Sequence, residues 1–305
     1  MAPTFAEATA INAVDSHTYT ANFTSEWCVG SVPHGGVVTS VFLRVAETHF
    51  RTTLAAQNQP HTISLHLEFL RRTQEGPAVL VVRDVKLGRQ TSTVHIALSQ
   101  DSREEVVGYL THSHMNIDNG LSLKTLWSLH PAPPLPPADF RSLLGGTEDH
   151  SWKEVNEPHA KFRKVTQRVR TFVPREGQVM PGLVDEWLRL DSGEKFTNES
   201  LGFASDSFPP VIEDLWYMEG RDERLPSFWY PTVILNLDIK KVLPPEGVEW
   251  LFVRIQPKNV RNGKMDLEVI IMNDIGEIIA LSNHVVLLVG TDRNLAARRN
   301  GQNKI

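Results

Sequence analysis

Apolar side chains recur at helical spacing in the stretch Val37–Phe50. Val37, Val41 and Val45 lie four residues apart on one face, and a second apolar row adjoins them. The stretch contains no proline and follows a pair of glycines. This pattern predicts a mostly buried helix.

Runs with the residue types and spacing of β-strands lie on both sides of this helix. One spans residues 17–25 and precedes it, and four follow it. The four are His61–Leu70, Ala78–Gly88, Gln90–Gln100 and Val106–Met115. Asp101–Glu104, between the last two, has the composition of a hairpin turn. A strand, a long helix and then antiparallel strands are typical of an α+β fold.

The second half of the chain repeats this plan. A shift of 170 positions lays Thr62 on Thr232, Leu65 on Leu235, Leu67 on Leu237 and Gly36 on Asp206. The returning strands are expected at Phe162–Val173, Leu183–Leu190, Val233–Val242, Trp250–Pro257, Met265–Met272 and Ile278–Val289, with Asn273–Gly276 as the matching hairpin turn. The helical position is Gly202–Tyr217, where Pro209-Pro210 predicts that the helix starts or restarts beyond the prolines.

A proline-rich run, Pro131–Pro137, separates the two halves and cannot lie inside a sheet. We therefore predict four segments. They are an N-terminal module at 1–116, a proline-rich linker at 117–160, a C-terminal module at 161–292 and a basic tail at 293–305. Only one of the two modules carries an acid at the repeated position, which indicates a fused pseudo-dimer with an asymmetric active site.

Composition excludes several classes of protein. Of the 305 residues, 41% are hydrophobic and 22% charged, as in an ordinary soluble globular protein. The net charge of −5 and pI near 6.2 argue against nucleic-acid binding. No apolar run reaches the length of a membrane span, and the first residues lack the features of a signal peptide. Together with the single cysteine, Cys28, these features favour a cytoplasmic protein. The final residues Asn303-Lys304-Ile305 only weakly resemble the Ser-Lys-Leu peroxisomal signal.

Several catalytic and cofactor motifs are absent from the sequence. It has no G-x-S-x-G elbow, no H-E-x-x-H, no paired C-x-x-C and no phosphate-binding glycine loop. His112 and His114 would share one strand face, but no third ligand accompanies them. We expect no metal and no redox cofactor.

Short motifs recur in order and spacing in both halves. In the first half they are Pro33–Gly36, Phe69–Arg71, Gly88-Arg89 and Gln100-Asp101; in the second half, Gly202–Asp206, Thr232 and Gly276 leading into Ala280. Together these motifs resemble the acyl-CoA thioesterase II family and the thioesterase-like superfamily around it. The resemblance covers about residues 15 to 290. It implies a double hotdog fold, in which two antiparallel sheets, each wrapped around a central helix, are fused in one chain.

The resemblance also implies an Asp, a Thr and a Gln gathered around a water molecule in the second module. By position the Asp falls on Asp206 and the Thr on Thr232. The Gln position falls on His284, which departs from the family pattern. A histidine there would make the site sensitive to pH near neutrality.

The residues themselves suggest how a thioester would be cleaved. Asp206 would act as general base, with its pKa raised by apolar surroundings, while Thr232 and His284 hold the water. The N–H groups of Gly35 and Gly36, at a helix start, would stabilise the oxyanion. His34 would line the site, and Val37, followed by Val41 and Phe42, would wall an apolar acyl groove.

Each of these residues also has a purely structural interpretation. Asp206 suits a helix N-cap, Thr232 suits a strand, and His284 fits a core or surface position. His34 fits a turn, and the two glycines would let helix and sheet pack closely.

The function expected from the sequence is an acyl-CoA, or related acyl thioester, hydrolase in which Asp206 activates water. Its partner would be the small-molecule substrate, and an exposed sheet edge would allow copies of the chain to associate as a homo-oligomer. Two alternatives stay open. One is a non-hydrolytic biosynthetic enzyme, an isomerase, dehydratase or cyclase acting on a polyketide-like substrate; the other is a catalytically silent acyl-binding protein.

Overall fold

Helix α2 (Gly35–Arg51) forms where the apolar spacing predicts it and carries the core of the first half. The computed structural model describes residues 2–117, 120–135, 137–145, 149–155, 160–218 and 228–296. Most of the predicted basic tail, with Arg298, Arg299 and Lys304, lies outside the described residues. No helix within these ranges is both long and apolar enough to cross a membrane.

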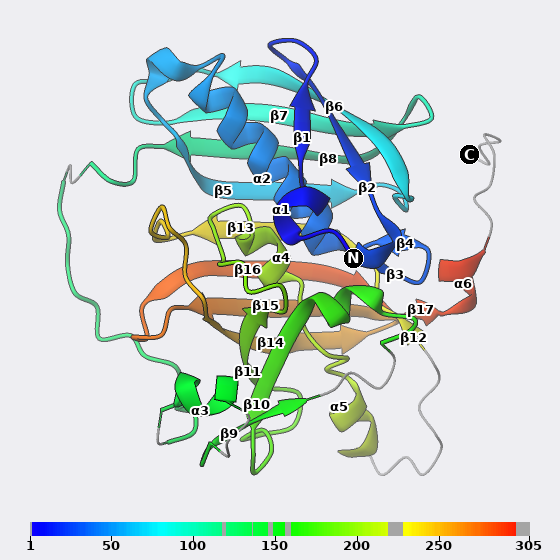
Figure 1. Ribbon diagram of the computed structural model, residues 1–305, viewed down its shortest axis with the longest axis vertical. Helices are drawn as coiled ribbons and strands as arrows, with labels where there is room; N and C mark the ends of the chain where they lie inside the picture. Colours follow the sequence, from blue (N-terminus) through cyan, green and yellow to red (C-terminus); the bar gives the residue numbers. More distant parts are fainter. Residues whose placement is uncertain are drawn as a thin grey trace.

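The described residues form a main sheet of thirteen strands, and every neighbouring pair in it is antiparallel (Figure 1). The first half supplies β1 (Ile11–Ala13), β2 (Thr18–Phe23), β6 (Gly76–Lys86), β7 (Ser92–Gln100), β8 (Arg103–Ser113) and β5 (His61–Phe69), in that spatial order. The second half continues with β13 (Thr232–Ile239), β16 (Ile278–Leu287), β15 (Lys264–Met272), β14 (Leu251–Arg261), β11 (Val184–Leu190), β10 (Val169–Pro174) and β9 (Trp152–Val155).

The two halves meet at the antiparallel pair β5–β13. His66 lies opposite Asn236, and their side chains are in contact at 2.7 Å. Leu65 and Leu67 lie opposite leucines of β13 in the same register. The expectation of two sheets is therefore corrected to one continuous sheet. The pairing satisfies the backbone N–H and C=O groups that two separate modules would leave exposed at these edges.

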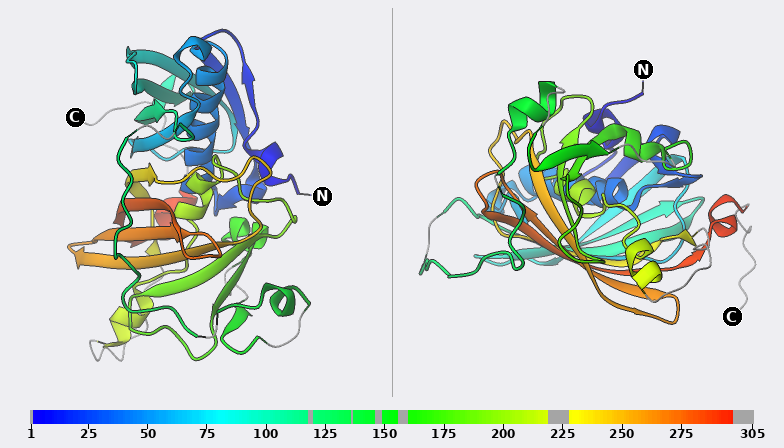
Figure 2. Two further views of the ribbon diagram at one scale, coloured as in Figure 1. Left: turned by 90° about the vertical axis from the view of Figure 1, so that its left-hand side faces the viewer. Right: turned by 90° about the horizontal axis from the view of Figure 1, so that it is seen from below.

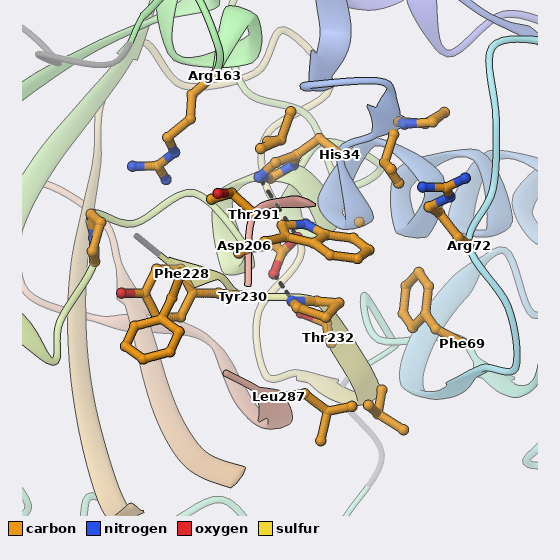
Figure 3. A pocket seen from close by; sticks show the side chains of 18 of the residues that line it. His34, Phe69, Arg72, Arg163, Asp206, Phe228, Tyr230, Thr232, Leu287 and Thr291 are labelled. Carbon is orange, nitrogen blue, oxygen red and sulfur yellow. Dashed lines mark hydrogen bonds and ion pairs between the residues drawn. The ribbon is translucent and has the colours of Figure 1, made fainter. Parts of the chain in front are cut away.

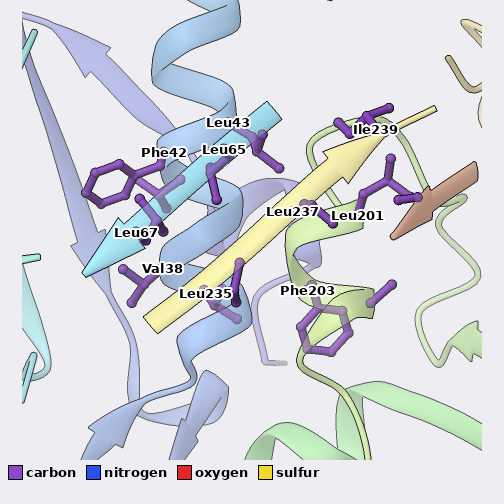
Figure 4. Packing of buried hydrophobic residues seen from close by; sticks show 14 of the residues in the cluster. Val38, Phe42, Leu43, Leu65, Leu67, Leu201, Phe203, Leu235, Leu237 and Ile239 are labelled. Atoms are coloured by element: carbon purple, nitrogen blue, oxygen red, sulfur yellow. The ribbon is translucent and has the colours of Figure 1, made fainter. Parts of the chain in front are cut away.

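The sheet curves around α2, which lies on its inner face (Figure 2). Val38 and Phe42 of α2 are completely buried and belong to one core with the leucines of β5 and β13 (Figure 4). Leu201 and Phe203 of α4 (Leu201–Ser205) complete this core from the second half. Burial of each such side chain stabilises the fold by about 1.5–3 kcal/mol.

Among the described residues, the second half has no helix as long as α2, which corrects the central helix that the resemblance implied for each module. α4 has only five residues and ends before Pro209-Pro210; α5 (Glu213–Met218) follows the prolines. A helix does restart beyond the prolines, as predicted, but the turn that packs against α2 precedes them. Asp206 caps the C-terminus of α4, so the N-cap interpretation is wrong.

The described residues also form shorter elements. They are α1 (Phe5–Ala8), α3 (Phe140–Gly145), α6 (Asp292–Leu295), the small pairs β3 (Cys28–Val29) with β4 (Val32–Pro33) and β12 (Phe228–Trp229) with β17 (Val289–Gly290), and three 3₁₀ turns, η1 (Ser25–Trp27), η2 (Ala55–Gln57) and η3 (Lys164–Arg168). The segment 117–160 contributes α3 and strand β9. Trp152 of β9 packs with Trp187 and Phe252 in a second, aromatic core.

Candidate active site

A cavity of about 750 Å³ opens where the two halves meet, beside the start of α2 and the end of α4. Phe69 lies at its β5 wall and Thr232 at its β13 wall. Gly35 and Asp206 also line it. The volume lies within the range of sites for small organic ligands.

Asp206 is held by hydrogen bonds from both halves of the chain. Figure 3 shows its contacts with Thr232 and His34. The Gly36 N–H donates to its Oδ2 at 2.8 Å, and the Thr232 hydroxyl donates to its Oδ1 at 3.2 Å. A Cβ on Gly35 would lie 2.8 Å from Oδ2, and a Cβ on Gly36 would lie 2.8 Å from the Gly202 carbonyl oxygen. The glycine pair therefore permits the start of α2 to lie close to Asp206 and to the helical turn before it, rather than to the sheet as the sequence suggested.

Two buried histidines flank the carboxylate. His34 Nε2 lies 3.7 Å from Oδ2, and His284 Nδ1 lies 3.6 Å from Oδ1. His34 Nδ1 accepts a hydrogen bond from the Gly36 N–H at 3.2 Å, so the proton of a neutral His34 ring is on Nε2 and faces Asp206. Both carboxylate oxygens are thus surrounded by donors.

The charge of Asp206 follows from these neighbours. Burial raises the pKa of its carboxyl group, but His34, His284 and the Gly36 N–H outweigh that effect and hold the pKa below its usual value. This corrects the expectation of a raised pKa. Burial lowers the pKa of His34, although the Asp206 carboxylate opposes the change. At neutral pH the site therefore contains an ionised Asp206 beside a neutral His34.

Comparison with known proteins decides the family. Residues 23–113 match the family model of the acyl-CoA thioesterase N-terminal domain, and residues 142–288 match that of the C-terminal domain. The chain belongs to the acyl-CoA thioesterase family. The resemblance predicted from the sequence motifs is therefore confirmed.

Individual relatives agree with this assignment. Over 98% of its length the chain is 37% identical to the thioesterase-like protein TwmA of Talaromyces wortmannii, covering 96% of that protein. A putative thioesterase II from Thermobifida fusca YX superposes with a TM-score of 0.69 at 22% identity, covering 95% of this chain and 99% of that one. A hot dog fold protein from Alicyclobacillus acidocaldarius superposes with a TM-score of 0.75 at 17% identity, with the same coverage. These structures show a hotdog fold for this thioesterase-family chain.

The cavity of this thioesterase-family protein does not include every residue that the sequence singled out. Val37, like Val41 and Phe42, is buried in the core and does not line it. His284 also does not line the cavity and lies behind Asp206, with its side chain fully buried. The Gly36 N–H points at Asp206, which leaves Gly35 as the glycine whose N–H has no acceptor among the described residues.

Aromatic side chains make up much of the wall, and none of them was expected from the sequence to line the site. They are Phe69, Phe162, Phe208, Tyr217, Phe228, Trp229 and Tyr230. Three of them stand together at positions 228–230, directly before Thr232. This aromatic cluster is visible in the sequence and could have indicated a binding wall. That it lies near Asp206 follows only from the tertiary fold.

Three arginines, Arg71, Arg72 and Arg163, also line the cavity, together with Asp206 as its single acidic residue among those described. Arg72 and Arg163 lie on opposite sides of Asp206 (Figure 3). Arg72 donates hydrogen bonds to the carbonyl oxygens at the end of α6, and Arg163 donates to the Phe208 carbonyl at 2.9 Å. The cavity therefore has an excess of positive charge.

A second, smaller pocket of about 20 Å³ occupies the opposite end of the β5–β13 pair. The 170-residue shift relates it to the large cavity, because Thr62 replaces Thr232 and Ile239 replaces Phe69. It holds Glu47, whose pKa is raised to about 8 by burial and by the neighbouring Glu199. Its volume is close to that of a single water molecule, so only one of the two related positions is open to a substrate.

Away from the cavity, His17, His49 and Asp84 have donor atoms within 4.8 Å of one another. His49 Nε2 and Asp84 Oδ1 are 3.0 Å apart, and the His49 Nδ1 contacts the Tyr19 hydroxyl at 3.2 Å. These are hydrogen-bonding distances, and we interpret the group as a hydrogen-bonded link between β2, α2 and β6.

Proposed function

We propose that the protein hydrolyses acyl thioesters, with Asp206 directing a water molecule onto the thioester carbonyl carbon. One observation carries this proposal: an ionised carboxylate lies at a 750 Å³ cavity and is oriented by the Gly36 N–H and the Thr232 hydroxyl. Membership of the acyl-CoA thioesterase family supports the same chemistry.

In this mechanism Asp206 accepts a hydrogen bond from the attacking water. The water oxygen forms a bond to the carbonyl carbon while one water proton passes to Asp206. The carbon–sulfur bond then breaks, and the leaving sulfur takes that proton, so the products are a free acid and a free thiol. The Gly35 N–H, at the positive end of the 17-residue helix α2, is the donor available to the oxyanion.

The cavity walls suggest where each part of the substrate lies. The aromatic side chains provide a large apolar surface for the acyl group. The excess of arginine over acidic residues suits an anionic carrier, such as the phosphate groups of coenzyme A. We also interpret the two halves as fused hotdog modules, since the 170-residue shift relates the paired residues His66 and Asn236.

The test is free-thiol release from short, medium and long acyl-CoAs. Asp206→Asn keeps the side-chain shape but removes the base, so kcat should fall by about 10²- to 10⁴-fold. Asp238→Asn is the matched control, because this aspartate lies on β13 with a half-exposed side chain outside the cavity, and its kcat should equal that of the wild type.

The rival functions give different results in the same experiment. Equal rates for wild type and Asp206→Asn would remove Asp206 from the mechanism. Acyl-CoA binding without release of thiol by the wild type would indicate a silent binding protein. An isomerised or dehydrated acyl-CoA, detected by mass spectrometry or chromatography, would indicate the biosynthetic alternative.

A further inference from the structure

Ser282 is a buried residue of β16 that lies outside the cavity and has two hydrogen-bonding neighbours. Its Oγ is 2.6 Å from the Asn236 carbonyl oxygen and 2.9 Å from His284 Nε2. A carbonyl oxygen carries no proton, so the short contact to Asn236 requires the Ser282 hydroxyl to donate. A hydroxyl has only one proton, so Ser282 Oγ must accept a hydrogen bond from His284. The proton in that hydrogen bond is therefore carried by His284 Nε2.

This arrangement determines what the other ring nitrogen of His284 must carry. Nδ1 is buried, makes no hydrogen bond within the described structure and lies 3.6 Å from Asp206 Oδ1. That distance leaves no room for a bridging water. A neutral ring with its proton on Nε2 would point the bare Nδ1 lone pair at an ionised carboxylate, whereas a proton on Nδ1 makes the contact attractive.

We propose that Ser282 is a positioning residue that keeps His284 doubly protonated, as an imidazolium whose Nδ1–H faces the Asp206 carboxylate. The inference rests on the proposed role of Asp206 as the group that directs water. In the resting enzyme the pair has no net charge. Once Asp206 has accepted the proton of the attacking water, the pair is cationic, and this favours transfer of that proton to the leaving sulfur.

The surroundings of His284 contain few other charges. Across the sheet it faces Leu235 on β13 and Leu267 on β15, and the ring of Phe208 packs against it with centroids 6.0 Å apart. The titratable groups near the pair are His34, on the other carboxylate oxygen, and Arg163, which lines the cavity. Because Asp206 is ionised, the proton that the contact between His284 Nδ1 and Asp206 Oδ1 requires is assigned to His284.

The test compares the pH profile of kcat for the wild type and Ser282→Ala. In the wild type, loss of the extra proton at alkaline pH leaves Nδ1 bare, so kcat should fall about tenfold per pH unit beyond the midpoint. In Ser282→Ala the neutral ring is free to place its proton on Nδ1 and keep the contact, so this alkaline fall should disappear. KM should stay within about twofold, since Ser282 does not line the cavity.

Two further variants separate positioning from packing. Ser282→Thr retains the hydroxyl and should restore the wild-type profile. Ser92→Ala removes an equally buried serine hydroxyl from β7 of the first half and should leave the profile unchanged. Superimposable profiles for wild type and Ser282→Ala would overturn the proposal.

A readout independent of activity keeps this inference separate from the proposed function. The ¹⁵N resonances of the His284 ring are assigned by their loss in His284→Gln. We expect both ring nitrogens to carry protons in the wild type at pH 7, and only Nδ1 in Ser282→Ala at alkaline pH. A wild-type ring with an unprotonated nitrogen at pH 7 would refute the proton assignment, whereas absence of thiol release alone would refute only the hydrolase function.

Discussion

Thr232 contributes one hydroxyl group to the site, and that group holds Asp206 Oδ1. Thr232→Val removes this donor while preserving shape and β-branching. A hydrogen bond to a charged group contributes about 1.5–3 kcal/mol, so we expect kcat for thiol release to fall about 10- to 100-fold. Thr232→Ser keeps the hydroxyl and should retain most of the activity. Equal activity in the Val and Ser variants would contradict the role assigned to the hydroxyl.

The buried ring of His112 should make the stability of the folded protein depend on pH. Burial lowers its pKa to about 3, and the ring stacks on Phe50 with centroids 3.9 Å apart. The unfolded chain binds a proton at this position below about pH 6.5, while the folded chain does so only near pH 3. This residue should therefore make the free energy of unfolding fall by about 1.4 kcal/mol per pH unit between those values as the pH decreases.

Urea unfolding at several pH values measures this slope. His112→Gln should have a lower stability overall and a shallower slope, because the titrating group is gone. His66→Gln, at a partly exposed position on β5, is the control and should keep the wild-type slope. An unchanged slope in His112→Gln would exclude His112 as the cause.

The sequence could name Asp206 and Thr232 through its resemblance to a known family, and its repeat pairs them with Gly36 and Thr62 of the first half. It could not give the charge state of Asp206, because the donors that lower its pKa come from His34 and Gly36, 170 or more positions away. The sequence also could not show whether Val37 faces the core or the cavity. Helical spacing identifies a buried face but does not distinguish a core from a cavity wall.

Among the elements, the short helix α4 depends on its contact with α2. Five residues are too few for a stable isolated helix. A Cβ on Gly202 would lie 2.8 Å from the Ser40 backbone nitrogen, so Gly202→Ala must push α4 away from α2. We expect a loss of about 1–3 kcal/mol of stability and, since α4 ends at Asp206, a fall in kcat as well.

The comparison for Gly202→Ala is Leu98→Ala, which removes a fully buried side chain from β7, remote from the cavity. It should lower the free energy of unfolding by about 2–5 kcal/mol while leaving kcat at 25 °C unchanged. Unfolding curves and thiol release are measured on both variants. If Gly202→Ala lost stability without any loss of kcat, the position of α4 would not control the site.

The positions of the helices and strands along the chain were largely predictable, whereas the pairing between strands was not. Alternation along β5 and β13 indicated strands, and both appear within two or three residues of the expected bounds. The same alternation says which face is buried but not which edge finds a partner, so the β5–β13 pairing was missed. For α4, the prolines were correctly identified as an interruption, but the packed turn lies before them.

For the whole molecule, the continuous sheet predicts one cooperative unfolding transition. Separating the halves would break the β5–β13 pairing and expose the leucines of both strands. Six of the seven tryptophans follow residue 117, so fluorescence reports mainly on the second half, while far-ultraviolet circular dichroism reports on both. The two signals should give the same urea midpoint. A fluorescence transition that separates from the dichroism transition would show that the halves unfold independently.

The contact between Gly36 and Asp206 has a consequence for how such a site can evolve. The 170-residue shift makes these two positions equivalent, yet they touch each other at 2.8 Å. A symmetric assembly of identical subunits encodes both positions with a single codon, so it would place either two carboxylates or two glycines in contact. Because this chain encodes positions 36 and 206 separately, one of them can be the acid while the other is the glycine that receives it.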